Sequence, residues 1–114
     1  MQCTIWHNPK CSKSRAALEM LQQKGIETEV VKYLEATPTK EIIKELLAKL
    51  KISARELMRT KEELYKELGL KEVADEEGLI DAMVEHPKLI ERPIVILENK
   101  AVIGRPPEKI LELF

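Results

Sequence analysis

The spacing of apolar residues changes along the first third of the chain. Residues 2–6 form a short apolar run that is typical of a strand. A helix is then predicted from about residue 12 to residue 24, ended by Gly25, and residues 28–33 read as a second strand. The apolar positions of the helix are Ala17, Leu18 and Leu21. Two strands joined by one helix predict a βαβ unit, which needs parallel strands and a right-handed crossover.

Helical spacing dominates the middle of the chain, from residue 39 to about residue 87. Here a Ser or Thr is twice followed by a Glu three positions later, the pattern of a capping box that opens a helix. The two pairs are Ser53 with Glu56 and Thr60 with Glu63. The first pair predicts a short helix over residues 54–59, closed by Arg59. We therefore expect an all-helical insertion in this region.

Strand signals return near the C-terminal end. Residues 94–97 and 101–103 are apolar runs separated by turn-forming residues, which predicts an antiparallel hairpin. A closing helix is expected to follow Pro106 and to dock on the sheet through Ile110, Leu111 and Phe114. The element order predicts an α/β protein with a thioredoxin-like fold. Its mixed four-stranded sheet would carry the helical insertion between the βαβ unit and the final ββα unit.

Length and composition set limits on the function. A chain of 114 residues fits one domain, so residues 1–114 are expected to form a single unit. The charged fraction of 34%, the apolar fraction of 44% and the net charge of −1 argue against disorder and against a nucleic-acid-binding surface. No apolar run approaches the ~20 residues of a membrane span, and the start lacks signal-peptide features. We expect a cytoplasmic protein that binds neither nucleic acid nor membranes.

Cys11 is the residue best placed for chemistry. It lies where the first strand gives way to the first helix, and a helix N-terminus stabilises the thiolate, the nucleophilic form of cysteine. Lys10, Lys13, Arg15 and His7 add positive charge nearby. The alternative is a buried, inert cysteine, which is the interpretation that we prefer for Cys3, on the same strand face as Ile5. Two cysteines eight positions apart fit neither a disulfide scaffold nor a zinc site.

Four further residues could assist such a thiol. Ser14 occupies the last position of what would be a Cys-x-x-Cys motif, so an external thiol would have to resolve any intermediate on Cys11. Arg59, Arg92 and Arg105 would each be unremarkable alone as exposed or helix-terminal arginines. If the three converge on Cys11, their planar guanidinium groups would bind a tetrahedral oxyanion.

A series of short segments along nearly the whole chain matches the pattern of a known family. In order, they are His7-Asn8-Pro9, Cys11, Ser14-Arg15, Tyr33-Leu34-Glu35, Ile52-Ser53, Leu57-Met58-Arg59, Leu68-Gly69-Leu70, His86-Pro87, Arg92-Pro93-Ile94-Val95 and Arg105-Pro106. By these segments the chain resembles the glutaredoxin-coupled arsenate reductase family, ArsC, which is grouped with Spx-like proteins in the thioredoxin-fold class. The resemblance implies that Cys11 attacks arsenate, that His7 favours the thiolate, and that Arg59, Arg92 and Arg105 bind the oxyanion. It implies supporting roles for Asn8, Ser14, Arg15 and Pro93.

The resemblance also implies the reaction partners. Glutathione would attack the arsenylated Cys11, glutaredoxin would resolve the glutathione adduct, and arsenite would be released. No bound metal or organic cofactor is expected, because glutathione is consumed as the reductant. Lys10, Ser12 and Lys13 differ from the residues typical around that thiol. Two alternatives stay open: a monothiol, glutathione-dependent disulfide oxidoreductase, and a non-catalytic Spx-like interaction protein.

Overall fold

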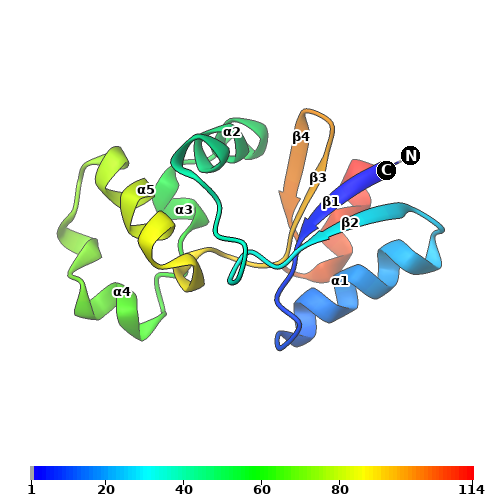
Figure 1. The fold of residues 1–114 in the computed structure, drawn as a ribbon, viewed down its shortest axis with the longest axis horizontal. Coiled ribbons are helices and arrows are strands. Elements are labelled where there is room, and N and C mark those ends of the chain that lie inside the picture. Colours follow the sequence, from blue (N-terminus) through cyan, green and yellow to red (C-terminus); the bar gives the residue numbers. More distant parts are fainter. Residues whose placement is uncertain (1) are drawn as a thin grey trace. The chain divides into compact units, whose positions relative to one another are not determined.

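The computed structural model describes residues 2–114, which divide into two compact units. The sheet unit comprises residues 2–36 and 92–114, and the helical unit comprises residues 37–91. Figure 1 shows the elements of each unit along the coloured chain. Within residues 2–114, no helix is both long enough and apolar enough to cross a membrane.

The sheet unit is built around a mixed four-stranded sheet with the strand order β2-β1-β3-β4. Strand β1 pairs in parallel with β2 and antiparallel with β3, and β3 pairs antiparallel with β4. This arrangement confirms the predicted α/β fold with its thioredoxin-like sheet. The elements are β1 (Gln2–Trp6), α1 (Ser12–Gln23), β2 (Glu27–Val31), β3 (Ile94–Leu97), β4 (Lys100–Ile103) and the 3-10 helix η3 (Pro107–Leu113).

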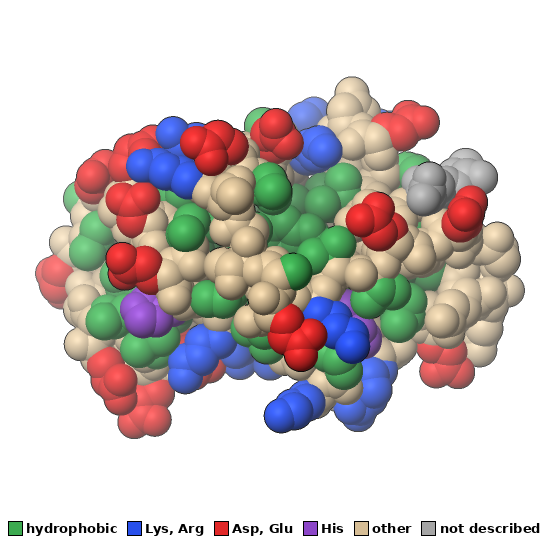
Figure 2. Space-filling view, viewed as in Figure 1, with side chains coloured by type: hydrophobic (Ala, Val, Ile, Leu, Met, Phe, Trp, Pro, Cys, Tyr) green, Lys and Arg blue, Asp and Glu red, His purple; other side chains and the backbone are tan. Residues whose placement is uncertain are grey.

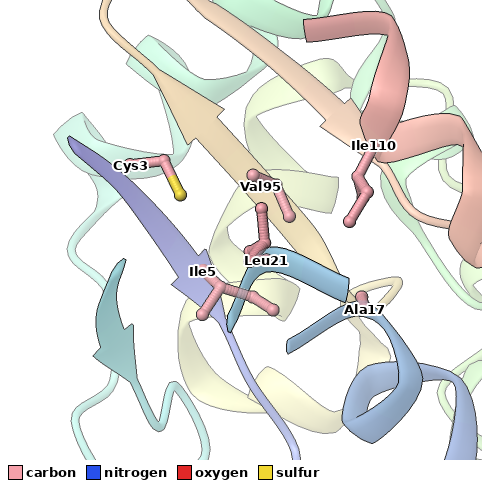
Figure 3. Packing of buried hydrophobic residues seen from close by; sticks show 6 residues of the cluster. All are labelled: Cys3, Ile5, Ala17, Leu21, Val95 and Ile110. Atoms are coloured by element: carbon pink, nitrogen blue, oxygen red, sulfur yellow. The ribbon is translucent and has the colours of Figure 1, made fainter. Parts of the chain in front are cut away.

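The core of the sheet unit forms between the sheet, α1 and η3. Figure 3 shows side chains from all three converging there. Cys3 and Ile5 of β1 are 2% and 0% exposed, which confirms the prediction that Cys3 packs in the core. The other members of this cluster are Ala17, Leu21, Val95 and Ile110.

The closing element differs from the prediction. It is a 3-10 helix, in which side chains three positions apart share a face. Ile110 is therefore buried, with Leu113 partly buried beside the same core cluster. Leu111 and Phe114 were expected to dock on the sheet, but they are 39% and 40% exposed, so that prediction was wrong.

The helical unit consists of short helices around its own apolar residues. Ser53 and Glu56 form the predicted capping box at the start of α3. The second predicted box was wrong, because α4 begins after Glu62, which caps it without a side-chain hydrogen bond, and Thr60 lies before that point. The elements are α2 (Lys40–Leu50), α3 (Ala54–Leu57), α4 (Glu63–Glu67), η1 (Leu70–Glu72), α5 (Glu76–Glu85) and η2 (Pro87–Leu89).

Helix α3 is also shorter than predicted. It ends at Leu57, and the chain becomes extended at Met58, which forms an isolated antiparallel bridge with Ile90. The backbone N–H of Arg59 donates to the carbonyl of Leu89 at 2.7 Å. Arg59 therefore does not close a helix. Pairing with the segment before β3 replaces the last predicted turn.

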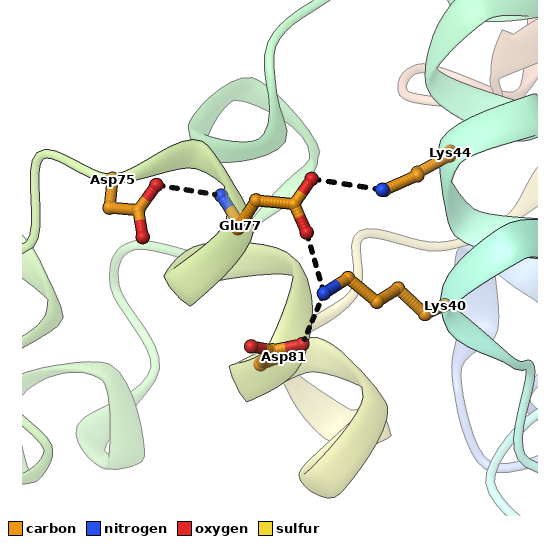
Figure 4. A network of polar contacts seen from close by, with 5 residues as sticks. All are labelled: Lys40, Lys44, Asp75, Glu77 and Asp81. Carbon is orange, nitrogen blue, oxygen red and sulfur yellow. Dashed lines mark hydrogen bonds and ion pairs between the residues drawn. The ribbon is translucent and has the colours of Figure 1, made fainter.

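An ion-pair network joins α2 and α5 inside the helical unit (Figure 4). Lys40 Nζ lies 2.5 Å from Glu77 and 3.2 Å from Asp81, and Lys44 Nζ lies 2.9 Å from Glu77. Hydrogen bonds to Lys40 and Lys44 lower the pKa of the Glu77 carboxyl. These groups are exposed, so the network contributes little to stability.

Candidate active site at Cys11

Cys11 is the N-cap residue of α1, with extended backbone angles of φ −95° and ψ 122°. Its N–H donates to the carbonyl of Asn8 at 3.0 Å, and its own carbonyl accepts from Arg15 N–H at 3.0 Å. The side chain is 9% exposed. The thiol thus stands at the helix N-terminus, where backbone N–H groups have no partner within the helix.

The surroundings of Cys11 favour the thiolate. Burial raises the pKa of the thiol, but the backbone N–H of Ser14, the positive charge of Arg92 and the N–H of Lys13 together lower it below the ordinary value of 9.0. From the sequence, we attributed the positive charge near the thiol to the basic side chains around residues 7–15. In the structure, the positive charge that lowers the pKa of Cys11 is that of Arg92. Cys3 shows the opposite behaviour, because burial raises the pKa of its thiol.

Hydrogen bonds within and around the Cys11 loop hold its backbone in place. His7 N–H donates to the carbonyl of Val31 at 2.8 Å, which ties the loop to β2. Lys10 N–H donates to Asn8 Oδ1 at 3.0 Å, and Arg15 Nη1 donates to the carbonyl of Pro9 at 2.9 Å. Asn8 and Arg15, predicted as supporting residues, therefore both contact the loop that carries the thiol.

His7 and Ser14 form a buried polar pair beneath this loop. His7 Nδ1 lies 2.6 Å from Ser14 Oγ, and the side chains are 6% and 0% exposed. The backbone N–H of Asn8 also donates to Ser14 Oγ at 3.0 Å. Burial lowers the pKa of His7, and the charges of Lys32 and Arg15 lower it further. A neutral imidazole adds no positive charge beside Cys11. His7 therefore acts on the thiol through its hydrogen bond with Ser14, whose backbone N–H interacts with Cys11.

Arg92 is the basic residue that interacts with Cys11. A hydrogen bond from its side chain and its positive charge both lower the pKa of the thiol. Its Nε and Nη1 atoms are buried and have no hydrogen-bond partner among the described residues. A half-buried guanidinium with two unused donor nitrogens next to a thiolate is suited to bind an anion that accepts hydrogen bonds from it.

Arg105 lies beside Arg92 at the end of β4. Its Nε donates to the carbonyl oxygen of Arg92 at 2.8 Å. The preceding Gly104 allows this approach, because a Cβ at that position would lie only 2.9 Å from Pro93 Cγ. Gly104 N–H donates to the carbonyl of Pro93 at 2.8 Å. The Arg92–Pro93 and Arg105–Pro106 peptide bonds are both cis.

Arg59 belongs to the helical unit. Its Nη1 lies 3.1 Å from a Glu62 carboxylate oxygen and 3.2 Å from the carbonyl of Lys88, and its Nε lies 3.9 Å from Glu91. The structure therefore brings five predicted site residues together in the sheet unit, namely His7, Cys11, Ser14, Arg92 and Arg105. A role for Arg59 at the thiol stays a prediction.

Comparison with known proteins identifies the family of the chain. The ArsC family model matches residues 6–113. The chain is 55% identical to YfgD of Escherichia coli (strain K12) over 98% of this chain and 96% of that protein. It is 52% identical to an arsenate reductase of Neisseria meningitidis, over 93% and 92% of the two chains. The solved structure of an arsenate reductase from Vibrio cholerae is 51% identical, covers 100% of this chain and 98% of its own, and superposes with a TM-score of 0.97. The chain belongs to the ArsC family.

Proposed function

We propose that the protein reduces arsenate to arsenite, with the Cys11 thiolate as the nucleophile and with glutathione and glutaredoxin supplying the electrons. The observation that carries the proposal is the half-buried Arg92 side chain. It lies beside a thiol of lowered pKa and keeps two donor nitrogens without partners among the described residues. Relatives from Neisseria meningitidis and Haemophilus influenzae that carry the name arsenate reductase support the choice of oxyanion.

Arsenate binding would use these free donors. Arsenate is a tetrahedral oxyanion that accepts hydrogen bonds at each oxygen, and guanidinium groups offer several donors in a fixed plane. Arg92 would hold the anion next to the Cys11 sulfur. Arg105 donates through Nε to the Arg92 carbonyl, and its Nη atoms, which form no hydrogen bond among the described residues, could make a second contact to the anion. Arg59 is proposed as a third ligand on the strength of the resemblance alone.

The first half of the reaction places arsenic between two sulfurs. The Cys11 thiolate forms a bond to arsenic, and an arsenate hydroxyl leaves as water after taking up a proton. A glutathione thiolate then bonds to the same arsenic, and a second oxygen leaves as water. Arsenic stays As(V) through both steps, because each replaces an oxygen ligand with a sulfur ligand. The Arg92 charge would stabilise the negative oxygens throughout.

The second half transfers the electrons. A glutaredoxin thiolate attacks the glutathione sulfur, and a disulfide forms between glutaredoxin and glutathione. The bond between that sulfur and arsenic breaks with its electron pair left on arsenic, which becomes As(III). Water then displaces Cys11 from arsenic, which releases arsenite and restores the thiolate. Two thiols are oxidised to one disulfide for each arsenate reduced, with one net water formed.

An external thiol is required because the chain has no second reactive cysteine near Cys11. Cys3 is 2% exposed in the core, and burial raises the pKa of its thiol. Ser14, at the position of a resolving cysteine, is buried and engaged with His7 and Asn8. Neither residue can attack an adduct on Cys11.

The proposal is tested by arsenate-dependent NADPH oxidation in the presence of glutathione, glutaredoxin and glutathione reductase. Wild-type protein and Cys3→Ala, which removes the buried thiol, should both turn over. Cys11→Ser should show none. Turnover that survives in Cys11→Ser, or that is absent in the wild type, would contradict the proposal.

The same thiol supports a second candidate, exchange with mixed disulfides of glutathione. The favouring observation is a thiol of lowered pKa that has Ser14 in place of a resolving cysteine. A monothiol of this kind exchanges with glutathione disulfides without closing an internal disulfide. Rapid deglutathionylation of a test peptide, together with no arsenite formation, would favour this candidate over arsenate reduction.

A further inference from the structure

A pocket of about 260 Å³ lies next to the Cys11 loop, inside the sheet unit. Residues 7–10 of the loop line one side of it. Lys32, Leu34 and Glu35, which follow β2, line the other side. The proposed arsenate chemistry leaves this pocket unused, because the guanidinium that interacts with the thiol belongs to Arg92, which does not line the pocket.

The walls of the pocket are held by backbone hydrogen bonds. His7 N–H bonds to the Val31 carbonyl at 2.8 Å, which joins the loop to the end of β2. The N–H groups of Glu35 and Ala36 both donate to the carbonyl of Lys32, at 2.9 and 2.8 Å, and close a turn there. Backbone hydrogen bonds of the fold therefore fix both walls of the pocket.

The lining carries charges of both signs. Lys10 and Lys32 are exposed cations and Glu35 is an exposed anion. Among residues 2–114, none of these three forms an ion pair. Leu34 adds an apolar side chain that is 41% exposed. Figure 2 shows that basic and acidic side chains are mixed over the surface that it draws.

Lys32 lies close enough to the loop for its charge to act on His7. Its charge is one of the two that lower the pKa of His7. Lys10 is the sequence neighbour of Cys11. A ligand held by these two cations would therefore lie beside the residues that carry and support the thiol.

We propose that this pocket binds the small thiol that attacks the Cys11 adduct, and that this thiol is a zwitterionic peptide of the size of glutathione. Its carboxylates would pair with Lys10 and Lys32, its ammonium group with Glu35, and its carbon chain would lie on Leu34. The proposal rests on the proposed function for the role of the thiol. At about 260 Å³ the pocket lies just below the roughly 300 Å³ at which small-molecule sites begin, so it would enclose only part of a ligand of this size.

The charges of both signs in the pocket lining favour a zwitterionic ligand over a simple anion. A site for free arsenate or phosphate would gain nothing from Glu35, whose carboxylate repels anions. A zwitterion has a partner for each of the three charges. A substitution of Glu35 therefore distinguishes a site for a zwitterion from a site for a simple anion.

The test measures how fast Cys11 forms a mixed disulfide with glutathione disulfide. In this reaction the Cys11 thiolate attacks one sulfur, a new S–S bond forms, and a glutathione thiolate leaves. The full-length wild type would be compared with Lys32→Ala and Glu35→Gln. Bis(2-hydroxyethyl) disulfide, which is uncharged, would be run in parallel to measure the intrinsic reactivity of the thiol.

We expect Lys32→Ala and Glu35→Gln each to slow the reaction with glutathione disulfide about fivefold, the effect of losing one exposed charge contact. The rate with the uncharged disulfide should stay as in the wild type. Lys24→Ala, which removes an exposed lysine at the far end of α1, should change neither rate.

Glu35→Gln gives the sharpest result because it makes the protein more positive. If only overall charge attracted the anionic disulfide, this variant would react faster. A faster reaction, an unchanged one, or an equal loss with both disulfides would overturn the proposal. No arsenate is present, so the result is independent of arsenate turnover. In the arsenate assay, both variants should raise the KM for glutathione and leave the KM for arsenate unchanged.

Discussion

His7 Nδ1 lies 2.6 Å from Ser14 Oγ, and both side chains are buried. Ser14 Oγ already accepts a hydrogen bond from Asn8 N–H, and a neutral imidazole can accept the hydroxyl proton at Nδ1. The backbone N–H of Ser14 is in turn the strongest contribution that lowers the pKa of Cys11. The bond between His7 and Ser14 thus fixes the first turn of α1 at the point where it stabilises the thiolate.

Replacing Ser14 by Ala should destabilise the fold. The change leaves His7 Nδ1 and Asn8 N–H without their partner in a buried site, at a cost of about 1–3 kcal/mol in the free energy of unfolding. Urea denaturation measures this loss. Ser12→Ala, an exposed serine in the same turn, is the matched control and should cost much less. Equal losses in the two variants would contradict a structural role for the buried pair.

The stability of the protein should fall as the pH decreases through 6.5. The pKa of His7 is lower in the folded protein than its ordinary value of 6.5, so in this range the unfolded chain binds a proton that the folded chain does not. The free energy of unfolding therefore decreases as the pH falls from 6.5 toward the folded pKa. Urea denaturation of wild type and His7→Gln across this range isolates the effect. The difference in the free energy of unfolding between the wild type and His7→Gln should shrink toward acid pH. A difference that stays constant with pH would exclude the titration of His7 as the cause of the pH dependence.

Replacing Arg92 by Gln should raise the pKa of Cys11. The variant removes both the charge and the side-chain hydrogen bond that lower it. The rate of Cys11 alkylation by iodoacetamide as a function of pH reports the thiolate fraction, so its midpoint should move upward. Lys13→Gln is the control, because Lys13 acts through its backbone N–H and that group is retained. A midpoint that shifts equally in both variants would point to general charge rather than to Arg92.

Arg55 should be the most sensitive polar residue of the helical unit. Its guanidinium donates to the Tyr65 hydroxyl and to the carbonyls of Leu70 and Val73. Arg55→Met keeps the carbon chain but leaves these groups without their donor, and we expect a loss of about 1.5–3 kcal/mol. Thermal or urea unfolding would show it. Lys71→Met, at an exposed position of η1, should be close to neutral by the same measurement.

Much of the fold follows directly from the sequence. The strands, α1 and the hairpin lie close to the predicted ranges, because each is marked by apolar spacing and by turn residues. Gly25 ends α1 in the left-handed conformation at φ +70°, as its position after the helix indicated. Errors arise where a local pattern competes with tertiary pairing, as at Met58, which pairs with Ile90 instead of continuing α3, or with another local pattern. Thr60 matches a capping box by residue type, but the turn before α4 is stabilised by Glu62, whose carboxylate pairs with Arg59.

The site could be predicted only in part. Cys11 was identified from its place at a helix start, and the arginines from the family resemblance. The bond between His7 and Ser14 was not foreseen, although a signal was present: Ser14 shares the buried helix face with Ala17 and Leu21, so its hydroxyl needs a buried partner. The pocket formed with Lys32 and Glu35 depends on the turn after β2, which apolar spacing does not specify.

The most direct test of the central claim, that Arg92 presents the oxyanion to Cys11, is arsenite production by wild type and Arg92→Gln at varied arsenate. We predict that kcat/KM for arsenate falls about tenfold to a hundredfold, the effect of losing one or two charge-assisted hydrogen bonds. The KM for glutathione should stay unchanged. An Arg92→Gln variant that reduces arsenate as efficiently as the wild type would contradict the account.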